Sequence, residues 1–247
     1  MIDKKNCTKT IGLIGYGNFG KLIASHLKEF FDIYVYDTHS LVPNDIESST
    51  LENALKQDII ILAIPYTGFK NFIEQNAHLI APNTLVIDVL SIKVKAIDLL
   101  EKHLHKDVEI FATHPLFGPE STKDGLKDKK IAIFPIRTTQ EKEITNFLTQ
   151  KLHLKIIKTT AKEHDKQMAY IQALSHFVSK ALVKFDLPVY EDQQTKTYEY
   201  LQSAKNIVKN DSDELFYTIQ NENPFAYDVR EDFLKTLEEI HKNINEH

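Results

Sequence analysis

The sequence predicts an α/β protein in which a mostly parallel sheet domain is followed by an all-α domain. Three observations lead to this fold class. Apolar runs of strand length alternate with helix-period segments through the first part of the chain. The pattern changes where two neighbouring runs, Glu109–Thr113 and Lys130–Pro135, have no helix between them, and from about Thr160 only long helical patterns remain. We therefore expect a sheet domain over residues 1–158 and a helical domain over residues 159–247.

The strands of the sheet domain are predicted from seven apolar runs. A run that is apolar on both faces indicates a parallel strand covered by helices on each side. One such helix follows the first strand, and the spacing of its apolar residues by three or four positions marks one face. The predicted strands are Thr10–Ile14, Ile33–Asp37, Ile59–Ile64, Thr84–Val89, Glu109–Thr113, Lys130–Pro135 and Lys155–Thr159, and the helix face consists of Phe19, Leu22, Ile23, Leu27 and Phe30.

The helical domain is predicted from three amphipathic segments. Asp211 followed by Glu214 fits a capping box that opens the middle helix, and Pro188 and Pro224 punctuate the segments. The apolar faces are expected to pack a helical core and to contribute part of a dimer interface, two uses that the sequence does not separate. These faces comprise Met168, Ile171, Leu174, Phe177, Val178, Ala181, Leu182 and Phe185, then Leu215, Phe216 and Ile219, and finally Val229, Phe233, Leu237, Ile240 and Ile244.

Composition predicts a cytoplasmic enzyme and argues against several other classes of protein. Of the 247 residues, 42% are hydrophobic and 26% are charged, which is ordinary for a globular chain. The single cysteine, Cys7, cannot form an internal disulfide, Met1–Thr10 lacks an apolar signal core, and no apolar run approaches the roughly 20 residues that span a bilayer. A net charge of −5 argues against a nucleic-acid partner, and the 11 histidines do not cluster with cysteines as zinc ligands would. We expect no membrane or nucleic-acid partner and no metal.

A glycine-rich turn after the first predicted strand matches the fingerprint of dinucleotide-binding sites. Gly15 permits the tight turn, Gly17 lets the backbone approach a pyrophosphate, and Gly20 allows the helix and the strand to pack closely. The start of the following helix supplies free N–H donors for the anion. This context predicts a Rossmann-type domain whose phosphate-binding segment is Gly15, Tyr16, Gly17, Asn18, Phe19 and Gly20.

An acid at the end of the second predicted strand bears on the choice of cofactor. Asp37 lies about 20 residues after the glycines, where the fingerprint places the residue that binds the adenosine ribose hydroxyls. Its carboxylate would repel a 2′-phosphate, and Thr38–Ser40 offers no arginine to bind one, so the sequence favours NAD over NADP. The alternative is that Asp37 is an ordinary turn residue. After a later strand, Ile64 and Pro65 are expected to line the cofactor cleft.

A histidine and a serine follow two later strands and are candidates for catalysis. The run Glu109–Thr113 ends directly on His114, which opens the stretch His114–Ser121. Ligands of open α/β sheets bind beyond the carboxyl ends of strands, and a histidine there can take a proton from a substrate hydroxyl near neutral pH. Ser91 could bridge the substrate oxygen and the imidazole. Each residue also has a structural explanation, because His114 could cap a strand beside a Pro-rich turn and Ser91 could cap the following helix.

Four motifs occur in order along nearly the whole chain, namely Gly15–Gly20, Asp88-x-x-Ser91-x-Lys93, His114-Pro-Leu-Phe-Gly-Pro119, and Glu163-His164-Asp165 through Leu174-Ser175-His176. Their combination resembles the prephenate/arogenate dehydrogenase family of tyrosine biosynthesis. By this resemblance His114 is the catalytic base, Ser91 is its hydrogen-bonding partner, and His176 faces the substrate from the long helix of a dimerisation domain. The resemblance implies a homodimer that uses NAD to convert arogenate to tyrosine, or prephenate to 4-hydroxyphenylpyruvate.

The reaction that this resemblance implies is an oxidative decarboxylation. His114 would draw the proton from the ring 4-hydroxyl of a cyclohexadienol, hydride would leave the same carbon for NAD, and the ring carboxylate would depart as carbon dioxide. Because aromatisation makes the step nearly irreversible, the enzyme chiefly needs to align the partners and assist one proton transfer. Positioned acid–base catalysis of this kind is worth roughly 10²–10⁴-fold.

The chain departs from many bacterial relatives, which carry a substrate-binding arginine in the helical domain. Neither Arg137 nor Arg230 lies where that arginine should fall. The corresponding segment, Gln194–Glu199, is similar to the plant-type arogenate enzymes. Lys196 within it is the candidate cation for the substrate carboxylate, with a solvated surface lysine as the alternative.

Two further residues are candidates for binding the substrate. Gln172 lies one turn before His176 and could orient that imidazole. Asp124 belongs to a loop that borders the active site in plant-type relatives, where an acid would attract the α-ammonium of arogenate. A polar turn needs no such role, so arogenate and prephenate both stay open as substrates.

Two other functions are open at this point. A β-hydroxyacid dehydrogenase shares the nucleotide domain and the helical domain, but its pattern places a catalytic lysine after a glycine-rich helix start, and neither Lys180 nor Lys205-Asn206 has that context. A non-catalytic, NAD-sensing dimer would need neither Ser91 nor His114 at neighbouring strand ends.

Overall fold

The chain forms two compact units, Met1–Ala161 and Lys162–His247. The computed structural model describes residues 9–190, 192–209 and 211–246, so Cys7 lies outside the described residues. The predicted boundary between residues 158 and 159 falls at the end of the last strand of the first unit. No helix in the described part of the chain is both long enough and apolar enough to cross a membrane.

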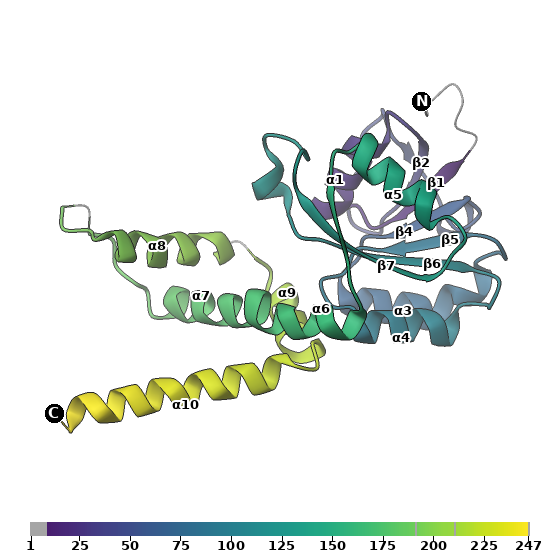
Figure 1. The fold of residues 1–247 in the computed structure, drawn as a ribbon. Helices are drawn as coiled ribbons and strands as arrows, with labels where there is room; N and C mark the ends of the chain where they lie inside the picture. The colour runs from purple at the N-terminus through teal and green to yellow at the C-terminus, as the bar shows by residue number, and fades with distance from the viewer. Residues whose placement is uncertain (1–8, 191, 210, 247) are drawn as a thin grey trace. The chain divides into compact units, whose positions relative to one another are not determined.

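The first unit is built on an eight-stranded sheet with the order β3-β2-β1-β4-β5-β6-β7-β8 (Figure 1). Among the described strands, all neighbours are parallel except β6 and β7, which are antiparallel. This arrangement confirms the predicted fold class, and the antiparallel pair lies where the sequence has no helix between two strand runs. The strands are β1 Thr10–Ile14, β2 Asp32–Tyr36, β3 Glu47–Ser48, β4 Ile59–Leu62, β5 Leu85–Asp88, β6 Glu109–Pro115, β7 Lys130–Arg137 and β8 Lys155–Lys158.

Helices cover both faces of this sheet, which is why its central strands are apolar on both sides. Every residue of β4 is buried. Helices α3 and α4 pack on one face and α1 and α5 on the other (Figure 1). The helices are α1 Asn18–Leu27, α2 Leu51–Ala54, α3 Tyr66–Asn76, α4 Val94–His103 and α5 Glu141–Gln150, with the short 3-10 turns η1 Ala77–Leu79 and η2 Pro119–Thr122.

Most strand bounds differ from the predicted ones by one or two residues, and two differences from the prediction follow from pairing with a neighbouring strand. β3 consists of two polar residues that pair with β2, and no apolar run marks it in the sequence. β6 does not end on His114: the strand continues to Pro115, because His114 lies opposite Ala132 and Pro115 opposite Ile131 of β7. The strand therefore ends two residues later than predicted, because these two residues pair with β7.

The second unit is helical throughout its described regular structure, as predicted for an all-α domain. Its apolar stripe over Met168–Phe185 is nevertheless not the continuous helix face that the spacing predicts. A π-helical turn interrupts it, and Ile171 and Phe185 are exposed. The elements are α6 Ala161–Met168, the π-helical η3 Ala169–Leu174, α7 Ser175–Lys184, α8 Lys196–Val208, α9 Asp213–Glu222 and α10 Ala226–Asn245.

The predicted capping box of α9 is wrong by one residue. Ser212 is the N-cap, and its hydroxyl accepts a hydrogen bond from the backbone N–H of Leu215 at 3.1 Å. Asp211 stands one position earlier, and its carboxylate lies 3.6 Å from the His176 imidazole instead. A serine hydroxyl at this position satisfies one of the N–H groups that the first turn of a helix leaves free.

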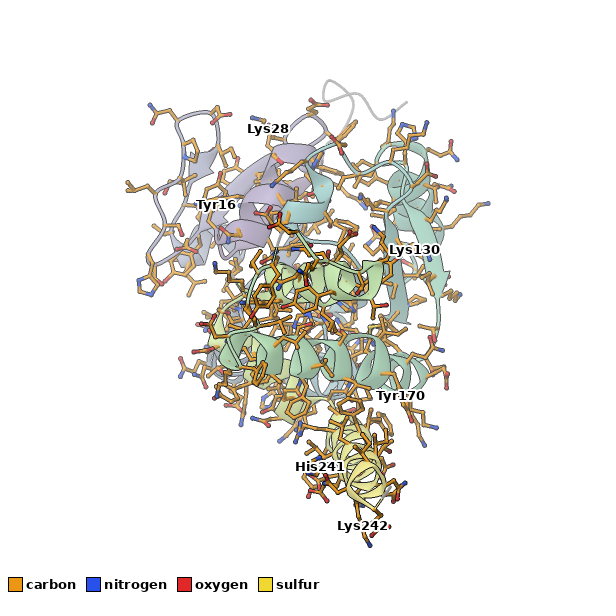
Figure 2. All side chains as sticks on the ribbon, turned by 90° about the vertical axis from the view of Figure 1, so that its left-hand side faces the viewer. Tyr16, Lys28, Lys130, Tyr170, His241 and Lys242 are labelled. Atoms are coloured by element: carbon orange, nitrogen blue, oxygen red, sulfur yellow. The ribbon has the colours of Figure 1, made fainter. Side chains whose placement is uncertain are left out.

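The last helix, α10, is only partly covered within one chain. Its first residue is buried in a small core, whereas Ile240 and Ile244 further along are exposed. In Figure 2, which looks along α10, side chains surround the helix near His241 and Lys242. A helix with apolar residues left in water is typical of an interaction surface.

Candidate active site

Most predicted site residues of the first unit lie at one edge of the sheet. The carboxyl ends of parallel strands meet at the same edge, where α/β sheets bind their ligands. The glycine-rich turn follows β1, Asp37 follows β2, Ile64 follows β4, Ser91 follows β5, and His114 lies near the end of β6. The sheet order β2-β1-β4-β5-β6 makes these five strand ends consecutive. The fold thus gathers residues that are far apart in the chain.

The three glycines of the turn meet three different surroundings. Gly15 has a φ of +100°, and a Cβ there would lie 2.5 Å from the carbonyl oxygen of Ala63. A Cβ at Gly20 would lie 2.2 Å from the carbonyl oxygen of Gly15, so this residue allows α1 to approach β1 closely. A Cβ at Gly17 would meet no atom within 4 Å. The turn is therefore tight at both ends and open in the middle, which fits an anion bound at the start of α1.

Asp37 ties the glycine-rich turn to the segment that follows β2. One carboxylate oxygen accepts the backbone N–H of Tyr16 at 2.6 Å, and the other accepts those of His39 and Ser40 at 2.8 and 2.6 Å. Burial acts to raise the pKa of Asp37, but these backbone donors outweigh it and hold the pKa below its usual range. Asp37 is therefore an anion near neutral pH, positioned beside the glycine-rich turn.

The remaining cofactor candidates surround the same turn. Ile64 lies beneath Gly15, since a Cβ on that glycine would come within 2.6 Å of the Ile64 side chain. Pro65 is the N-cap of α3. The centre of the Phe19 ring lies 6.3 Å from the centre of the Phe117 ring, and this contact links the start of α1 to the stretch after β6.

His114 is buried within the last residues of β6, with 6% of its surface exposed. Its position in the strand is set by pairing with β7, opposite Ala132. A buried imidazole at the ligand-binding edge is shielded from bulk water, which favours proton transfer with a bound substrate over exchange with solvent. This geometry is compatible with the predicted base.

Ser91 lies half-buried in the loop between β5 and α4. It does not cap α4, because that helix begins at Val94 with Lys93 as its N-cap and without a side-chain cap. The structural explanation considered for Ser91 is therefore excluded. Among the contacts of the described residues there is no hydrogen bond between Ser91 and His114, so their predicted pairing stays a prediction.

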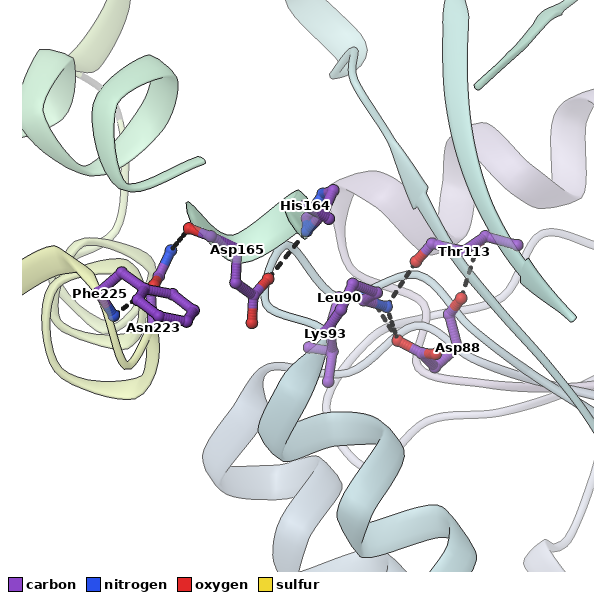
Figure 3. Close-up of polar contacts among 8 residues, drawn as sticks. All are labelled: Asp88, Leu90, Lys93, Thr113, His164, Asp165, Asn223 and Phe225. Atoms are coloured by element: carbon purple, nitrogen blue, oxygen red, sulfur yellow. Dashed lines mark hydrogen bonds and ion pairs between the residues drawn. The ribbon is translucent and has the colours of Figure 1, made fainter. Parts of the chain in front are cut away.

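A buried ion pair flanks Ser91, and no role for this pair was predicted from the sequence. Asp88 and Lys93 are both fully buried and form the pair (Figure 3). The Lys93 ammonium also donates to the carbonyl oxygen of Thr113 at 2.6 Å, and the Thr113 hydroxyl donates to the carbonyl oxygen of Asp88 at 2.7 Å. Burial raises the pKa of Asp88 above its ordinary value, although the Lys93 charge opposes this shift. The signal in the sequence was an acid and a lysine close together in an apolar segment, since buried charges are normally paired.

The helical unit contains a second buried polar cluster (Figure 3). His164 Nδ1 lies 2.8 Å from a carboxylate oxygen of Asp165, and both side chains are buried. The side-chain amide of Asn223 donates to the carbonyl oxygen of Asp165 at 2.8 Å. The bond from Asn223 joins α6 to the end of α9, a link that was not predicted from the sequence.

His176 lies half-buried on α7, and its side chain contacts a different residue from the predicted one. Its Nδ1 atom lies 3.6 Å from Asp211, whereas no contact of the described residues joins it to the Gln172 side chain. The π-helical turn that contains Gln172 changes the relation between the two side chains from that of an α-helix. Burial lowers the pKa of His176, and the Asp211 charge partly offsets this.

Lys196 lies at the start of α8 with an exposed side chain. Its ammonium donates to Glu199 at 2.5 Å and lies 5.5 Å from the centre of the Tyr200 ring. These contacts are those of a surface lysine, the alternative considered from the sequence. A role in holding a substrate carboxylate would require the ion pair to open.

Asp124 is exposed and lies away from the glycine-rich turn. It lines a hollow together with Ser25, His26 and Glu29 of the last part of α1 and the residues that follow it. The glycine-rich turn opens the opposite end of that helix. This placement does not favour the predicted contact between Asp124 and a substrate amine.

Two family models match the chain over most of its length. The prephenate dehydrogenase nucleotide-binding domain matches residues 40–157, and the prephenate dehydrogenase dimerization domain matches residues 160–247. The first match begins after the glycine-rich turn and Asp37. The assignment of those residues therefore depends on their geometry.

Known proteins with similar sequences carry related names. A probable arogenate/prephenate dehydrogenase of Methanocaldococcus jannaschii is 27% identical over 96% of this chain and 57% of the relative, so the chain spans little more than half of that protein. Arogenate dehydrogenase 2, chloroplastic, of Arabidopsis thaliana is 25% identical over 98% of this chain and 71% of the relative.

A solved structure shares the fold over most of the chain. Prephenate dehydrogenase from Aquifex aeolicus, in complex with hydroxyphenyl propionate and NAD+, superposes with a TM-score of 0.74 at 19% identity and covers 97% of this chain and 92% of that one. The matched nucleotide-binding and dimerization domains occur in the same order as the sheet and helical units. The chain therefore belongs to the prephenate dehydrogenase family.

Proposed function

We propose that the protein oxidises and decarboxylates a cyclohexadienol, arogenate or prephenate, with NAD as the hydride acceptor. The observation that carries the proposal is the position of His114, a buried imidazole at the same sheet edge as the open glycine-rich turn. The match to both family domains supports it. The relatives from M. jannaschii and A. thaliana are named for these two substrates.

The glycine-rich turn fits the diphosphate of a dinucleotide. The open space at Gly17 leaves room for phosphate oxygens beside the first N–H groups of α1, which have no acceptor within the helix. Asp37 stands beside this turn and would bind the ribose hydroxyls, since each of its carboxylate oxygens can accept more than one hydrogen bond. Bound NAD would supply the acceptor for the hydride.

The chain's own residues align the ring and move one proton. His114 accepts the proton of the ring 4-hydroxyl, while the hydride leaves the same carbon and the ring carboxylate leaves as carbon dioxide. Ser91, in the loop after β5, holds the hydroxyl oxygen towards the imidazole. Alignment of this kind contributes several kcal/mol, on the order of 7 or more in favourable cases.

We propose His176 as the substrate-binding residue of the helical unit, with Lys196 as the candidate cation for the substrate carboxylate. Because burial lowers the pKa of His176, its imidazole is mainly neutral near pH 7 and can donate one hydrogen bond and accept another. Gln172 and Asp124 are weaker candidates, since the contact of the His176 imidazole is with Asp211 and Asp124 lies beside the last part of α1.

We also propose a homodimer formed through the helical unit. The apolar side chains of Ile240 and Ile244 on α10 are exposed in a single chain, and burying them against a second copy would remove them from water. The match of residues 160–247 to a dimerization domain supports this assembly.

The two lysines considered for a β-hydroxyacid dehydrogenase have structural partners. Lys180 donates to Asp213 at 2.7 Å, and Lys205 donates to the carbonyl oxygen of Leu187 at 2.7 Å. Lys180 therefore joins α7 to α9, and Lys205 joins α8 to the segment between α7 and α8. They do not favour that alternative activity.

A substrate assay tests the proposed function. Purified protein is mixed with NAD and prephenate, arogenate or a 3-hydroxy acid, and NADH absorbance is followed. We expect turnover of prephenate, arogenate or both, and none of the 3-hydroxy acid. Turnover of the hydroxy acid alone would reassign the reaction, and no turnover with any substrate would favour an NAD-sensing protein.

Cofactor choice is tested with the variant Asp37→Asn. Asparagine keeps an oxygen that accepts the N–H of Tyr16 but removes the charge that binds ribose hydroxyls and repels a 2′-phosphate. We expect kcat/KM with NAD to fall about tenfold, as for the loss of one charge-assisted hydrogen bond, and the preference for NAD over NADP to shrink. The matched control is Asp58→Asn, whose carboxylate binds the start of β1 at the opposite edge of the sheet. An unchanged ratio of the two kcat/KM values would contradict the assignment of Asp37.

A further inference from the structure

The buried pair of Asp88 and Lys93 lies where β5 and β6 stop sharing backbone hydrogen bonds. Within the described strands, the two pair through residues 85–86 and 109–110, whereas the other edge of β6 pairs with β7 along residues 110–115, with a bulge between Ile110 and Phe111. The carboxyl end of β5 and the part of β6 that carries His114 are therefore not joined by a backbone ladder. Something other than sheet pairing must hold them in register.

Side-chain hydrogen bonds take over at this point (Figure 3). The Lys93 ammonium binds the Asp88 carboxylate and the carbonyl oxygen of Thr113, the latter at 2.6 Å. The Thr113 hydroxyl donates to the Asp88 carbonyl oxygen at 2.7 Å, and the Leu90 N–H donates to the Asp88 carboxylate at 3.0 Å. Asp88 and Lys93 lie at the two ends of the loop that holds Ser91. Both are therefore hydrogen-bonded to Thr113, the residue before His114.

Stability alone does not account for such a pair. Both side chains are fully buried, and removing two charges from water costs about as much as their attraction returns. The second carboxylate oxygen of Asp88 is buried without a hydrogen-bond partner among the described residues. Replacing a buried ion pair by apolar residues of similar volume is often neutral or stabilising, but here it would also remove the hydrogen-bond partners of the Leu90 N–H and the Thr113 carbonyl oxygen. What an apolar pair would not supply is a directional link between the Ser91 loop and β6.

We propose that the Asp88–Lys93 pair positions the Ser91 loop against the strand end that carries His114 and thereby sets the alignment needed for turnover. This inference rests on the proposed function of His114. Asp88 and Lys93 are positioning residues, because they act through Thr113 and the loop. A displacement of about 1 Å at a reacting group can cost roughly 10²-fold in rate.

The test is the double variant Asp88→Leu/Lys93→Met, which replaces the pair by apolar side chains of similar size. We expect it to fold with a lower Tm, because the Leu90 N–H and the Thr113 carbonyl oxygen lose these partners, and to keep its KM for NAD within about twofold, while kcat falls roughly 10²-fold. The matched control is Glu109→Gln. Glu109 begins β6 at the opposite edge, where its carboxylate accepts hydrogen bonds from residues 138–140. This control should keep the wild-type kcat.

A second background separates positioning from a structural defect. In His114→Asn, the double substitution should add little further loss, because the pair acts through His114. A structural defect would lower the rate by the same factor in both backgrounds and would overturn the inference. A double variant with the same kcat as an active wild-type enzyme would also overturn the inference. A wild type without turnover, or a His114→Asn variant as fast as wild type, would overturn the proposed function and this inference with it.

If the double variant does not fold, Thr113→Val carries the test. It removes the hydroxyl that bonds to the Asp88 carbonyl oxygen and leaves the ion pair in place. We expect kcat to fall about tenfold with an unchanged KM for NAD, as for the loss of one hydrogen bond in the link. A wild-type kcat in this variant would overturn the inference.

Discussion

The variant His114→Asn is expected to lower kcat with arogenate or prephenate by roughly 10²–10⁴-fold and to leave NAD affinity near wild type. Asparagine is smaller than histidine but polar, so it fills much of the same buried space opposite Ala132. It can form hydrogen bonds but cannot take up a proton near neutral pH. NAD affinity is expected to depend instead on the glycine-rich turn and Asp37, which follow other strands. NADH absorbance measures the rate, and calorimetry measures NAD binding.

The control for this substitution is His26→Asn. His26 lies half-buried in the last turn of α1, at the end of that helix opposite the glycine-rich turn. We expect this variant to keep the wild-type kcat. A His114→Asn rate within about twofold of wild type would remove the base assignment, since general-base catalysis is worth far more than that.

The variant Gly17→Val is expected to raise the Kd for NAD by at least about tenfold, which corresponds to about 1.4 kcal/mol of binding free energy. A Cβ at Gly17 meets no atom within 4 Å, so the folded protein accommodates a side chain there. That side chain would occupy the space in which the pyrophosphate is expected to lie. Gly15 and Gly20 differ, because a Cβ at either residue would collide with backbone and disturb the turn itself. Calorimetry with NAD and the thermal unfolding midpoint Tm distinguish the two effects.

Gly68→Ala is the matched control for Gly17→Val. Gly68 is exposed within α3, and a Cβ there reaches its nearest neighbour, the Ile64 side chain, only at 4.0 Å. Alanine in a helix interior should stabilise the protein by up to about 1 kcal/mol without changing the Kd for NAD. A Gly17→Val protein that binds NAD as tightly as wild type would contradict the phosphate-binding assignment.

The parts of the fold that could be predicted are those specified by neighbouring residues. Strand β4 is apolar on both faces, so its sequence alone marks it as a central strand. The turn at Gly15 needs a positive φ that glycine adopts readily, and this requirement is also local. β3 could not be predicted, because its two polar residues become a strand only through pairing with β2.

In the site, the sequence identified reactive residue types more reliably than their partners. His114 and the glycine-rich turn lie at the predicted edge of the sheet. The partner of His176 is Asp211, which lies beyond α8 in the chain. Asp124 belongs to a loop, and the loop's path along α1 places it away from the turn. Such placements follow from packing between distant segments, which local patterns do not encode.

By itself, the sequence determined a sheet unit followed by helices, a tight glycine-rich turn and a histidine near a strand end. These features follow from residue periodicity and from local backbone requirements. Only the tertiary structure decided that Lys93 is buried against Asp88 and Thr113, and that this link joins β5 to β6 beyond the residues through which the two strands pair. The physical reason is that a buried charge finds its partner through the order and twist of the strands, which bring together segments that are separate in the chain.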